Sequence, residues 1–331
     1  MSKERPSSYF CPMTRFLYYV FLLPLSYLPW SLIYAISNLL SFLLYRVLRY
    51  RGKVIFSNLR ASFPEKSKPE IEKIGKEFYR HFTDQWMETL KLFSISRKTA
   101  IERCKLINPE LLDKYKNQHI ICVLGHHNNW EMAAVALDPQ VEHQTIAIYK
   151  QVKDPFLDKV ILESRSKFGM KMISTEKAKK TIVEETDAPS IVFFVADQSG
   201  LTSKKVYWLP FLNQDTAVVT GPERFSKMLD SPVVFMKIHK MKRGRYKLEF
   251  EDILSKPKES EEGEITVRHA KVLEAVIRAS PEYWLWSHKR WKKGRLPHNQ
   301  IRYDLEGIYK KLGLPMDEMK VSSPTGYQEV Q

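Results

Sequence analysis

The stretch HIICVLGHHNNWE, residues 119–131, decides the fold, because it passes from an apolar run through a glycine turn into a helical pattern. The run at 119–124 predicts a buried strand, and residues 131–137 predict a helix. A strand that feeds a helix in this way is typical of α/β proteins with a parallel sheet. Ligands bind to such sheets where the strands end, so the turn at 125–130 is the first candidate for a functional site.

The same alternation continues after this turn. Short runs rich in Val and Ile predict strands at 144–148, 190–196, 206–209, 232–238 and 246–250. Helical patterns lie between them at 155–168, 176–184, 222–229 and 264–279, and a further amphipathic helix is predicted at 69–93. The sequence therefore predicts an α/β fold in which helices flank a central, mostly parallel sheet.

Composition is that of a globular protein with an unusual charge. Of 331 residues, 44% are hydrophobic and 27% charged, which excludes a disordered or collagen-like chain. Fifty-three Lys and Arg against 38 Asp and Glu give a net charge of +15. Such a surplus attracts nucleic acid, an anionic membrane surface or an acidic protein, and composition does not choose among them. The three cysteines lack any metal-binding spacing, so we expect no metal site.

The amino-terminal segment favours a membrane. Residues 16–45 contain no charge, and this stretch exceeds the roughly 20 residues that cross a hydrocarbon core. A basic collar suited to cytoplasmic headgroups begins at Arg46. Pro24 and Pro29 interrupt the stretch, so two shorter helices in one leaflet are an alternative to a single span, and a helical hairpin in a soluble core is another. We expect a membrane anchor at 1–48, an α/β domain at 49–312 and a polar tail at 313–331.

His126 and Glu131 suit a catalytic pair. One helix would hold them apart, but a strand–turn–helix allows the carboxylate to fold back onto the imidazole. A carboxylate that holds one ring nitrogen makes the other a better base for a hydroxyl proton. The segment also fits a structural role, in which Asn128 and Glu131 cap the helix and the histidine is a turn residue. Between the two histidines we favour His126 over His127 as the base, because it directly follows the glycine.

Two further charged residues are candidates for substrate binding. Asp197 follows a predicted strand, so it should project at the same sheet edge as His126. There it would bind a hydroxyl or order basic neighbours, although an Asp before a Ser-Gly pair also suits a simple turn. Arg165 follows a helical stretch and suits a phosphate clamp or an oxyanion, or else a solvated helix charge.

The segment around 287–293 interleaves tryptophans with cations. Trp286 and Trp291 flank Lys289 and Arg290, and Lys292 and Lys293 follow. Aromatic anchors beside cations suit an interfacial patch or a docking site for an acidic carrier protein. The same charges would attract nucleic acid, but no RNA- or DNA-binding motif accompanies them. We therefore expect a role in binding acidic substrates and no nucleic-acid partner.

Several blocks follow one another along most of the chain up to about residue 295. They are Asn58-Leu59, Phe63-Pro64-Glu65, Gly125-His126 with Asn129-Trp130-Glu131, Tyr149-Lys150, Arg165, Asp197-Gln198, Leu209-Pro210-Phe211, Thr220-Gly221-Pro222 and the run from Pro281 to Trp291. In this order they resemble the late (secondary) lipid A acyltransferases, within the lysophospholipid acyltransferase superfamily and its His-x4-Asp/Glu signature.

The resemblance implies a glycerol-phosphate acyltransferase-like fold, with His126 as general base, Glu131 as its orienting partner and no cofactor. It implies an acyl-carrier-protein thioester as donor and a hydroxyl of a lipid A precursor as acceptor. The enzyme would be held at the inner membrane, with its catalytic domain facing the cytoplasm. Substrate-binding roles would fall to Arg165, Asp197, Gln198, Lys289 and Arg290. The alternatives are another glycolipid, an aminolipid or a glycerophospholipid as acceptor, or a membrane-tethered binding protein without catalysis.

Overall fold

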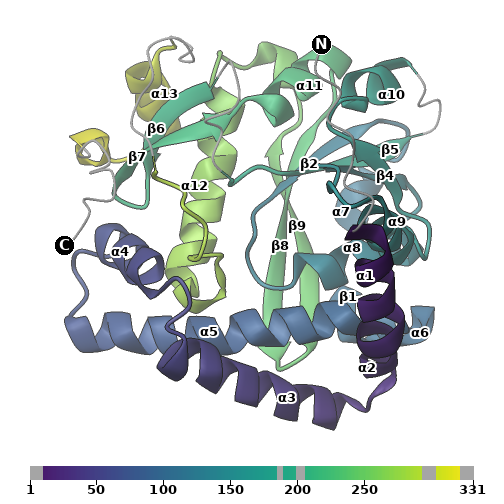
Figure 1. The fold of residues 1–331 in the computed structure, drawn as a ribbon. Helices are drawn as coiled ribbons and strands as arrows, with labels where there is room; N and C mark the ends of the chain where they lie inside the picture. Colours follow the sequence, from purple (N-terminus) through teal and green to yellow (C-terminus); the bar gives the residue numbers. More distant parts are fainter. Residues whose placement is uncertain (1–9, 185–188, 199–205, 293–302, 321–331) are drawn as a thin grey trace, which may run out of the picture.

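The computed structural model describes residues 10–184, 189–198, 206–292 and 303–320 (Figure 1). Within these residues, seven strands form one sheet in the order β1-β9-β8-β2-β5-β3-β4, and β6 and β7 form a separate antiparallel pair. In the large sheet every neighbouring pair of strands is parallel except β8 with β9, so the predicted mostly parallel α/β fold is confirmed. The strands are β1 Cys104–Leu106, β2 Ile120–Leu124, β3 Gln144–Tyr149, β4 Lys171–Ser174, β5 Ser190–Val195, β6 Val206–Phe211, β7 Gln214–Val219, β8 Val233–Lys242 and β9 Arg245–Leu254.

Helices cover both faces of the sheet. They are α4 Gly52–Ser62, α5 Lys68–Lys91, α6 Arg97–Arg103, α7 Glu110–Asp113, α8 Trp130–Leu137, α9 Pro155–Arg165, α10 Ala178–Glu184, α11 Gly221–Leu229, α12 Glu264–Ala279 and α13 Leu305–Leu312. Strand β2 divides the core: Ile121 and Val123 pack in the cluster that contains α12, whereas Cys122 and Leu124 pack in the cluster that contains α8. Because both faces are buried, such strands read as unbroken apolar runs, which explains why they were visible in the sequence.

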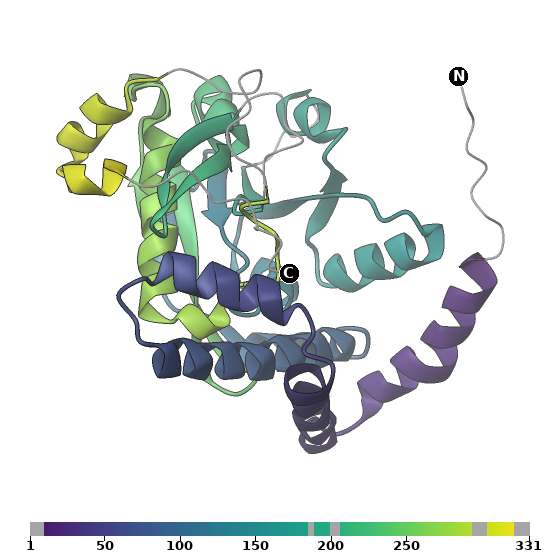
Figure 2. The same cartoon turned by 60° about the vertical axis from the view of Figure 1, so that its left-hand side comes forward.

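Strands β1, β4 and β7 were not predicted. The run at 206–209 is a strand, but it belongs to the small β6–β7 pair, which Figure 2 shows on the same side of the molecule as α12 and α13. Strand β7 begins with the polar residues Gln214, Asp215 and Thr216, so it lacks an apolar run. The turn before it has positive φ at Leu212 and Asn213, a backbone suited to a tight two-residue hairpin.

The amino-terminal segment forms two helical pieces. The first comprises α1 Phe10–Leu17, a π-helical turn Tyr18–Leu22 and α2 Leu23–Tyr27; the second comprises α3 Trp30–Phe42 and a π-helical turn Leu43–Val47. They separate at Pro29, because the residue before a proline is forced out of the helical region. Within the described residues, one helix, Trp30–Val47, is long and apolar enough to cross a membrane, judged by length and composition alone. It is a candidate membrane anchor.

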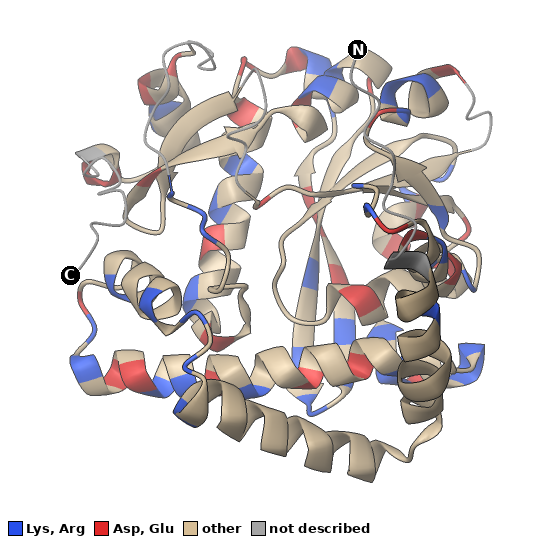
Figure 3. Ribbon diagram, in the orientation of Figure 1, with Lys and Arg blue, Asp and Glu red and all other residues tan. Residues whose placement is uncertain are grey.

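Helix α3 and its neighbour α5 differ in charge. Helix α3 carries no charged side chain, whereas α5, which lies alongside it, carries acids and bases along its length (Figure 3). At the other end of the chain, the predicted polar tail begins with a short 3-10 helix, Met316–Lys320, and residues 321–331 lie outside the described part.

Candidate active site

The imidazole of His126 is held by Asp197. The Nδ1 atom of His126 lies 2.5 Å from Oδ1 of Asp197, and the backbone N–H of His126 donates to Oδ2 at 2.8 Å. The two residues meet because β2 and β5 are parallel neighbours in which Leu124 is aligned with Val195, so both chains reach the sheet edge two residues later. Asp197 therefore projects beside His126, as its place after a strand predicted.

The carboxylate of Asp197 is buried and well supplied with donors. Its Oδ2 atom also accepts a hydrogen bond of 2.7 Å from the indole Nε1 of Trp284. Burial alone would raise the pKa of this carboxyl, but the electrostatic attraction of His126 and the hydrogen bonds from His126 and Trp284 hold the pKa well below its usual value. An ionised Asp197 fixes Nδ1 of His126 as the protonated nitrogen and leaves Nε2 as an acceptor. Sequence reasoning had assigned no role to Trp284.

The other ring nitrogen of His126 faces a polar neighbour and an aromatic wall. The Nε2 atom lies 3.0 Å from the amide nitrogen of Gln198, which donates to it in this tautomer. The ring of Trp130 stands edge-on to the imidazole, with centroids 4.7 Å apart. A substrate hydroxyl that takes the place of the Gln198 amide would meet the unprotonated nitrogen.

The expected contact between Glu131 and His126 does not occur. Glu131 lies in the first turn of α8, and its carboxylate is turned toward Arg165 at the end of α9. The guanidinium of Arg165 donates from Nε at 2.7 Å and from Nη2 at 2.5 Å, a bidentate pair. Burial would lower the pKa of Arg165, but the charge of Glu131 raises it overall. The carboxylate that holds His126 therefore comes from Asp197, at the end of β5, and not from Glu131.

The alternative in which Asn128 caps the helix is also wrong. Asn129 is the cap, since its side chain accepts the backbone N–H of Met132 at 2.9 Å. Asn128 instead has a positive φ of 57° and donates to the carbonyl of Ile238 at 2.6 Å. The expected cap between Asn128 and Glu131 therefore does not form, and the carboxylate of Glu131 binds Arg165 instead.

His127 points away from this site. Its Nε2 atom lies 3.0 Å from the carbonyl oxygen of Ser280, and its side chain is buried. Burial lowers the pKa of His127 to about 4, so its imidazole is neutral near pH 7. This geometry favours His126 as the histidine that meets a substrate.

A cavity of about 410 Å³ opens beside His126. His126, Glu131, Arg165 and Gln198 lie on its wall, which brings four of the predicted site residues together. The remainder of the wall is largely apolar and comes from α8, β2, β3, β4, β5 and β8; it includes Leu124, Ala133, Leu137, Met170, Met172, Phe193 and Met236. A largely apolar wall with polar groups at one place is the usual form of a site for an amphipathic ligand.

The carboxy-terminal segment does not form the expected interfacial patch. Trp286 is fully buried and donates to the carbonyl of Pro281 at 2.6 Å, and Trp291 is buried and donates to Thr216 at 2.8 Å. Arg290 is only 5% exposed, and its guanidinium donates to the carbonyl of Ala217. Apolar packing of the indoles thus outweighs the pull of the neighbouring charges toward water.

The three remaining cations of that segment are lysines. Lys289 and Lys292 are exposed, whereas Lys293 lies outside the described residues. Of the predicted substrate-binding pair Lys289 and Arg290, therefore, only Lys289 presents its charge to solvent. No group of three or more His, Cys, Asp or Glu that would hold a metal ion occurs in the part of the chain that the structure describes.

Comparison with known proteins identifies the class of enzyme. Residues 3–293 match the model of the bacterial lipid A biosynthesis acyltransferase family, so the chain belongs to this family and is an acyltransferase of lipid A. A lipid A biosynthesis lauroyltransferase of Escherichia coli (strain K12) is 24% identical to the chain over 272 residues, which cover 80% of this chain and 87% of that enzyme.

Proposed function

We propose that this acyltransferase uses His126 as general base to move a fatty acyl group from an acyl-carrier-protein thioester to a hydroxyl of a lipid A precursor, at the cytoplasmic face of the inner membrane. The observation that carries the proposal is the position of the His126 imidazole, between the buried carboxylate of Asp197 and the wall of the cavity. A histidine oriented in this way accepts a hydroxyl proton at neutral pH.

The reaction needs no nucleophile from the protein. The acceptor hydroxyl gives its proton to Nε2 of His126 while its oxygen attacks the thioester carbonyl carbon. The carbon–sulfur bond then breaks, and the departing thiolate takes the proton from Nε2. Asp197 stabilises the transient imidazolium and keeps Nδ1 facing away from the substrate. The products are an ester of the glycolipid and a free carrier thiol.

Arg165 is suited to the negative charge that develops on the carbonyl oxygen. Arg165 lies on the wall of the same cavity as His126, and the two hydrogen bonds that its guanidinium donates to Glu131 fix the plane of the group. Preorganised cations that face a developing oxyanion lower the barrier of acyl transfer. Glu131 thus takes the role of a positioning residue for Arg165, in place of the role of partner to His126 that the sequence resemblance implied.

The apolar part of the cavity is suited to the acyl chain of the donor. Its alanine, leucine and methionine side chains offer hydrocarbon contacts, and the methionines that line it, Met170, Met172 and Met236, adapt readily to a flexible chain. The name of the Escherichia coli relative specifies a lauroyl group for that enzyme. We propose a saturated chain of similar kind here, with its carbonyl at His126.

An acyl-carrier protein as donor agrees with the charge of this chain. Carrier proteins of this class are acidic, and a surface with a net charge of +15 attracts them. The test is a transfer assay with the purified chain, a lipid A precursor and one acyl group presented either on its carrier protein or on coenzyme A. We expect an ester product by mass spectrometry and a kcat/KM at least tenfold higher with the carrier. Equal rates would remove the carrier from the proposal, and no ester with either donor would refute the function.

A further inference from the structure

We propose that α1, α2 and α3 lie in the plane of one membrane leaflet, docked on the catalytic domain, and do not cross the bilayer. The inference concerns the candidate span Trp30–Val47, and it rests on the proposed function in taking the lipid surface to be the membrane that holds the acceptor.

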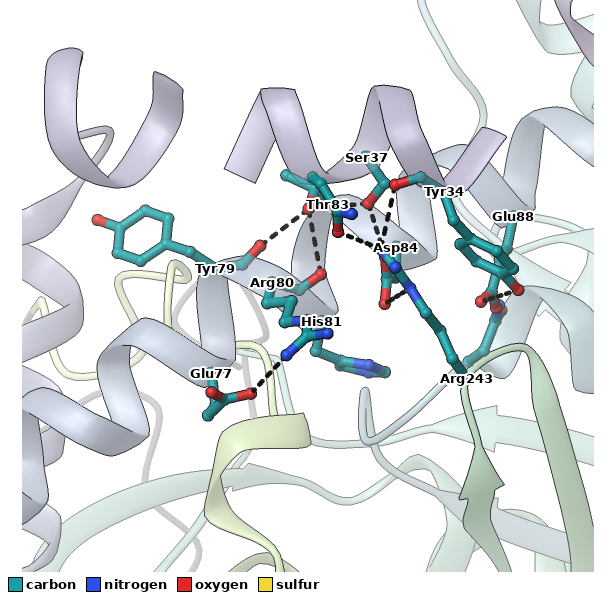
Figure 4. Close-up of polar contacts among 12 residues, drawn as sticks. Tyr34, Ser37, Glu77, Tyr79, Arg80, His81, Thr83, Asp84, Glu88 and Arg243 are labelled. Carbon is teal, nitrogen blue, oxygen red and sulfur yellow. Dashed lines mark hydrogen bonds and ion pairs between the residues drawn. The ribbon is translucent and has the colours of Figure 1, made fainter. Parts of the chain in front are cut away.

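One face of α3 is bound to the catalytic domain by polar side chains (Figure 4). The hydroxyl of Tyr34 donates to Glu88 at 3.0 Å, and the hydroxyl of Ser37 donates to Asp84 at 2.6 Å. Arg243, at the turn between β8 and β9, donates to the side chain of Asn38 at 2.8 Å. We call these residues, Tyr34, Ser37, Asn38, Asp84, Glu88 and Arg243, the docking network.

The docking network lies at the middle of the candidate span. Asp84 is buried, and Arg243 binds both of its carboxylate oxygens, at 2.5 to 3.0 Å. If α3 crossed the bilayer while it kept this packing, Ser37 would stand near the hydrocarbon centre. The Asp84–Arg243 pair and the charged side chains of α5 would then also lie within the hydrocarbon layer (Figure 3). Charges at that depth cost several kcal/mol each, so the packed arrangement excludes a span.

The turn before α3 is bound as well. The ammonium group of Lys91 donates to the carbonyls of Ser26 at 2.5 Å and Leu28 at 2.8 Å, and Ser94 donates to Ser26 at 2.6 Å. These carbonyls are free of helical partners because the chain breaks at the proline that follows. A span would carry this turn to the far side of the membrane, away from Lys91.

The opposite surface of these helices is suited to lipid. Twelve of the twenty exposed large apolar side chains among the described residues lie between Met13 and Leu48. They include Phe16, Phe21, Leu39 and Phe42, each more than half exposed. Where the segment ends, a cavity of about 760 Å³ is lined by basic residues that suit anionic headgroups: Arg46, Arg49, Lys53, Arg60 and Lys68. An apolar face beside a polar, docked face is the form of a helix that lies in the interface.

Docking also connects the membrane helices to the active site. Glu88, which accepts from Tyr34 on α3, accepts from the side chain of Asn129 at 2.6 Å. Asn129 caps α8, the helix that carries Glu131 and begins just after His126. Removal of α3 from its place would therefore leave a buried carboxylate short of a donor next to the catalytic turn.

The first experiment crosslinks α3 to α5. The hydroxyl oxygens of Ser37 and Thr83 lie 3.1 Å apart, which is within reach of a disulfide after substitution by cysteine. In a Cys11→Ser background, we expect Ser37→Cys/Thr83→Cys to crosslink almost completely in oxidised membrane vesicles. The crosslinked protein should stay membrane-bound in high salt. The control pair Leu39→Cys/Thr83→Cys should crosslink at least tenfold less, because Leu39 is on the exposed face. Equal crosslinking of both pairs, or release of the crosslinked protein from the membrane, would overturn the proposal.

The second experiment needs no change in the docking network. Tyr27, 70% exposed at the end of α2, and Lys289, exposed on the catalytic domain, are each replaced by cysteine. Both variants are labelled with a membrane-impermeant maleimide in spheroplasts and in inside-out vesicles. Helices in one leaflet place both positions on the same side, so both should react in the same preparation. Reaction of the two from opposite sides would establish a span. The readout does not depend on acyl transfer, so failure of the proposed function would leave it unchanged.

Discussion

The turn after β2 and the segment after α12 both contain tryptophan and histidine side chains. In the turn, His126 and Trp130 line a cavity, whereas in the later segment the tryptophans pack in the core. In the turn, His126 lies on a cavity wall, with Nδ1 bound to Asp197 and Nε2 beside the side-chain amide of Gln198. In the later segment, Trp286, Arg290 and Trp291 are buried and donate hydrogen bonds to backbone carbonyls or to Thr216. Trp284 donates its indole N–H to the carboxylate of Asp197. The proposed chemistry therefore lies where parallel strands end, and the aromatic segment packs behind it.

The largest effect on kcat should come from the replacement of His126. His126→Ala removes the proposed base, and we expect kcat to fall by about 10²- to 10⁴-fold with the fold and membrane association unchanged. His127→Ala is the matched control, because its buried imidazole bonds to the carbonyl of Ser280 and does not line the cavity beside His126. Steady-state kinetics of both variants would decide. An inactive His127→Ala beside a nearly normal His126→Ala would reverse the assignment.

The next effect separates the two carboxylates of the site. Asp197→Asn keeps the shape but loses the charge that orients His126, so we expect kcat to fall by about 10²- to 10³-fold. We expect kcat to fall less in Glu131→Gln than in Asp197→Asn. The kcat of Arg165→Lys should resemble that of Glu131→Gln, because both variants disturb the same bidentate pair. Kinetics of all three variants would test this grouping. The proposed pairing of His126 with Asp197 fails if Asp197→Asn stays active while Glu131→Gln does not.

A third prediction uses pH to probe the buried histidine of the same turn. The pKa of His127 is about 4 in the folded protein and roughly 6.5 in an unfolded chain. Between about pH 6.5 and pH 4, His127 is protonated in the unfolded chain but neutral in the folded protein. Because the unfolded state binds the extra proton, the free energy of unfolding decreases as the pH falls through this range. His127→Gln should lack this loss.

The measurement is urea unfolding in detergent at pH 7 and at pH 4.5. We expect the free energy of unfolding of the wild type to drop by on the order of 1–3 kcal/mol more than that of His127→Gln. Parallel changes in the two proteins would show that His127 titrates alike in both states and is not buried as described.

The smallest effect belongs to the exposed cation of the aromatic segment. Lys289→Gln should raise the KM for the carrier donor by less than about fivefold, with kcat unchanged, because a rim charge acts chiefly on association. Higher salt should shrink the difference. Arg290→Gln should instead lower the melting temperature, because this side chain is buried and bonded to Ala217. A loss of stability in Lys289→Gln, or none in Arg290→Gln, would contradict the difference in burial.

The parts of the fold with strong periodicity could be predicted from the sequence. Helix α12 begins and ends at the predicted residues, 264 and 279, and β5 differs by one residue, because both bury regular apolar patterns. The placement of Asp197 beside His126 followed from the same reasoning, since parallel strands deliver their ends to one edge.

What could not be predicted depends on contacts between distant segments. The partner of Glu131 is set by where α9 ends in space, 34 residues later, and no local pattern reports that. The burial of Trp286 and Trp291 is likewise decided by α4 and the β6–β7 pair: Asn58 binds the carbonyl of Trp286, and Thr216 binds the indole of Trp291. A cation beside a tryptophan reads the same in sequence whether the pair faces lipid or the core.

The most direct test of the account is mass spectrometry of lipid A from cells that lack this chain, complemented with wild type, His126→Ala or His127→Ala at equal membrane levels. We expect lipid A of the uncomplemented cells to lack one acyl chain. Wild type and His127→Ala should restore it, and His126→Ala should not. Unchanged lipid A in the deletion strain, or full restoration by His126→Ala, would contradict the account.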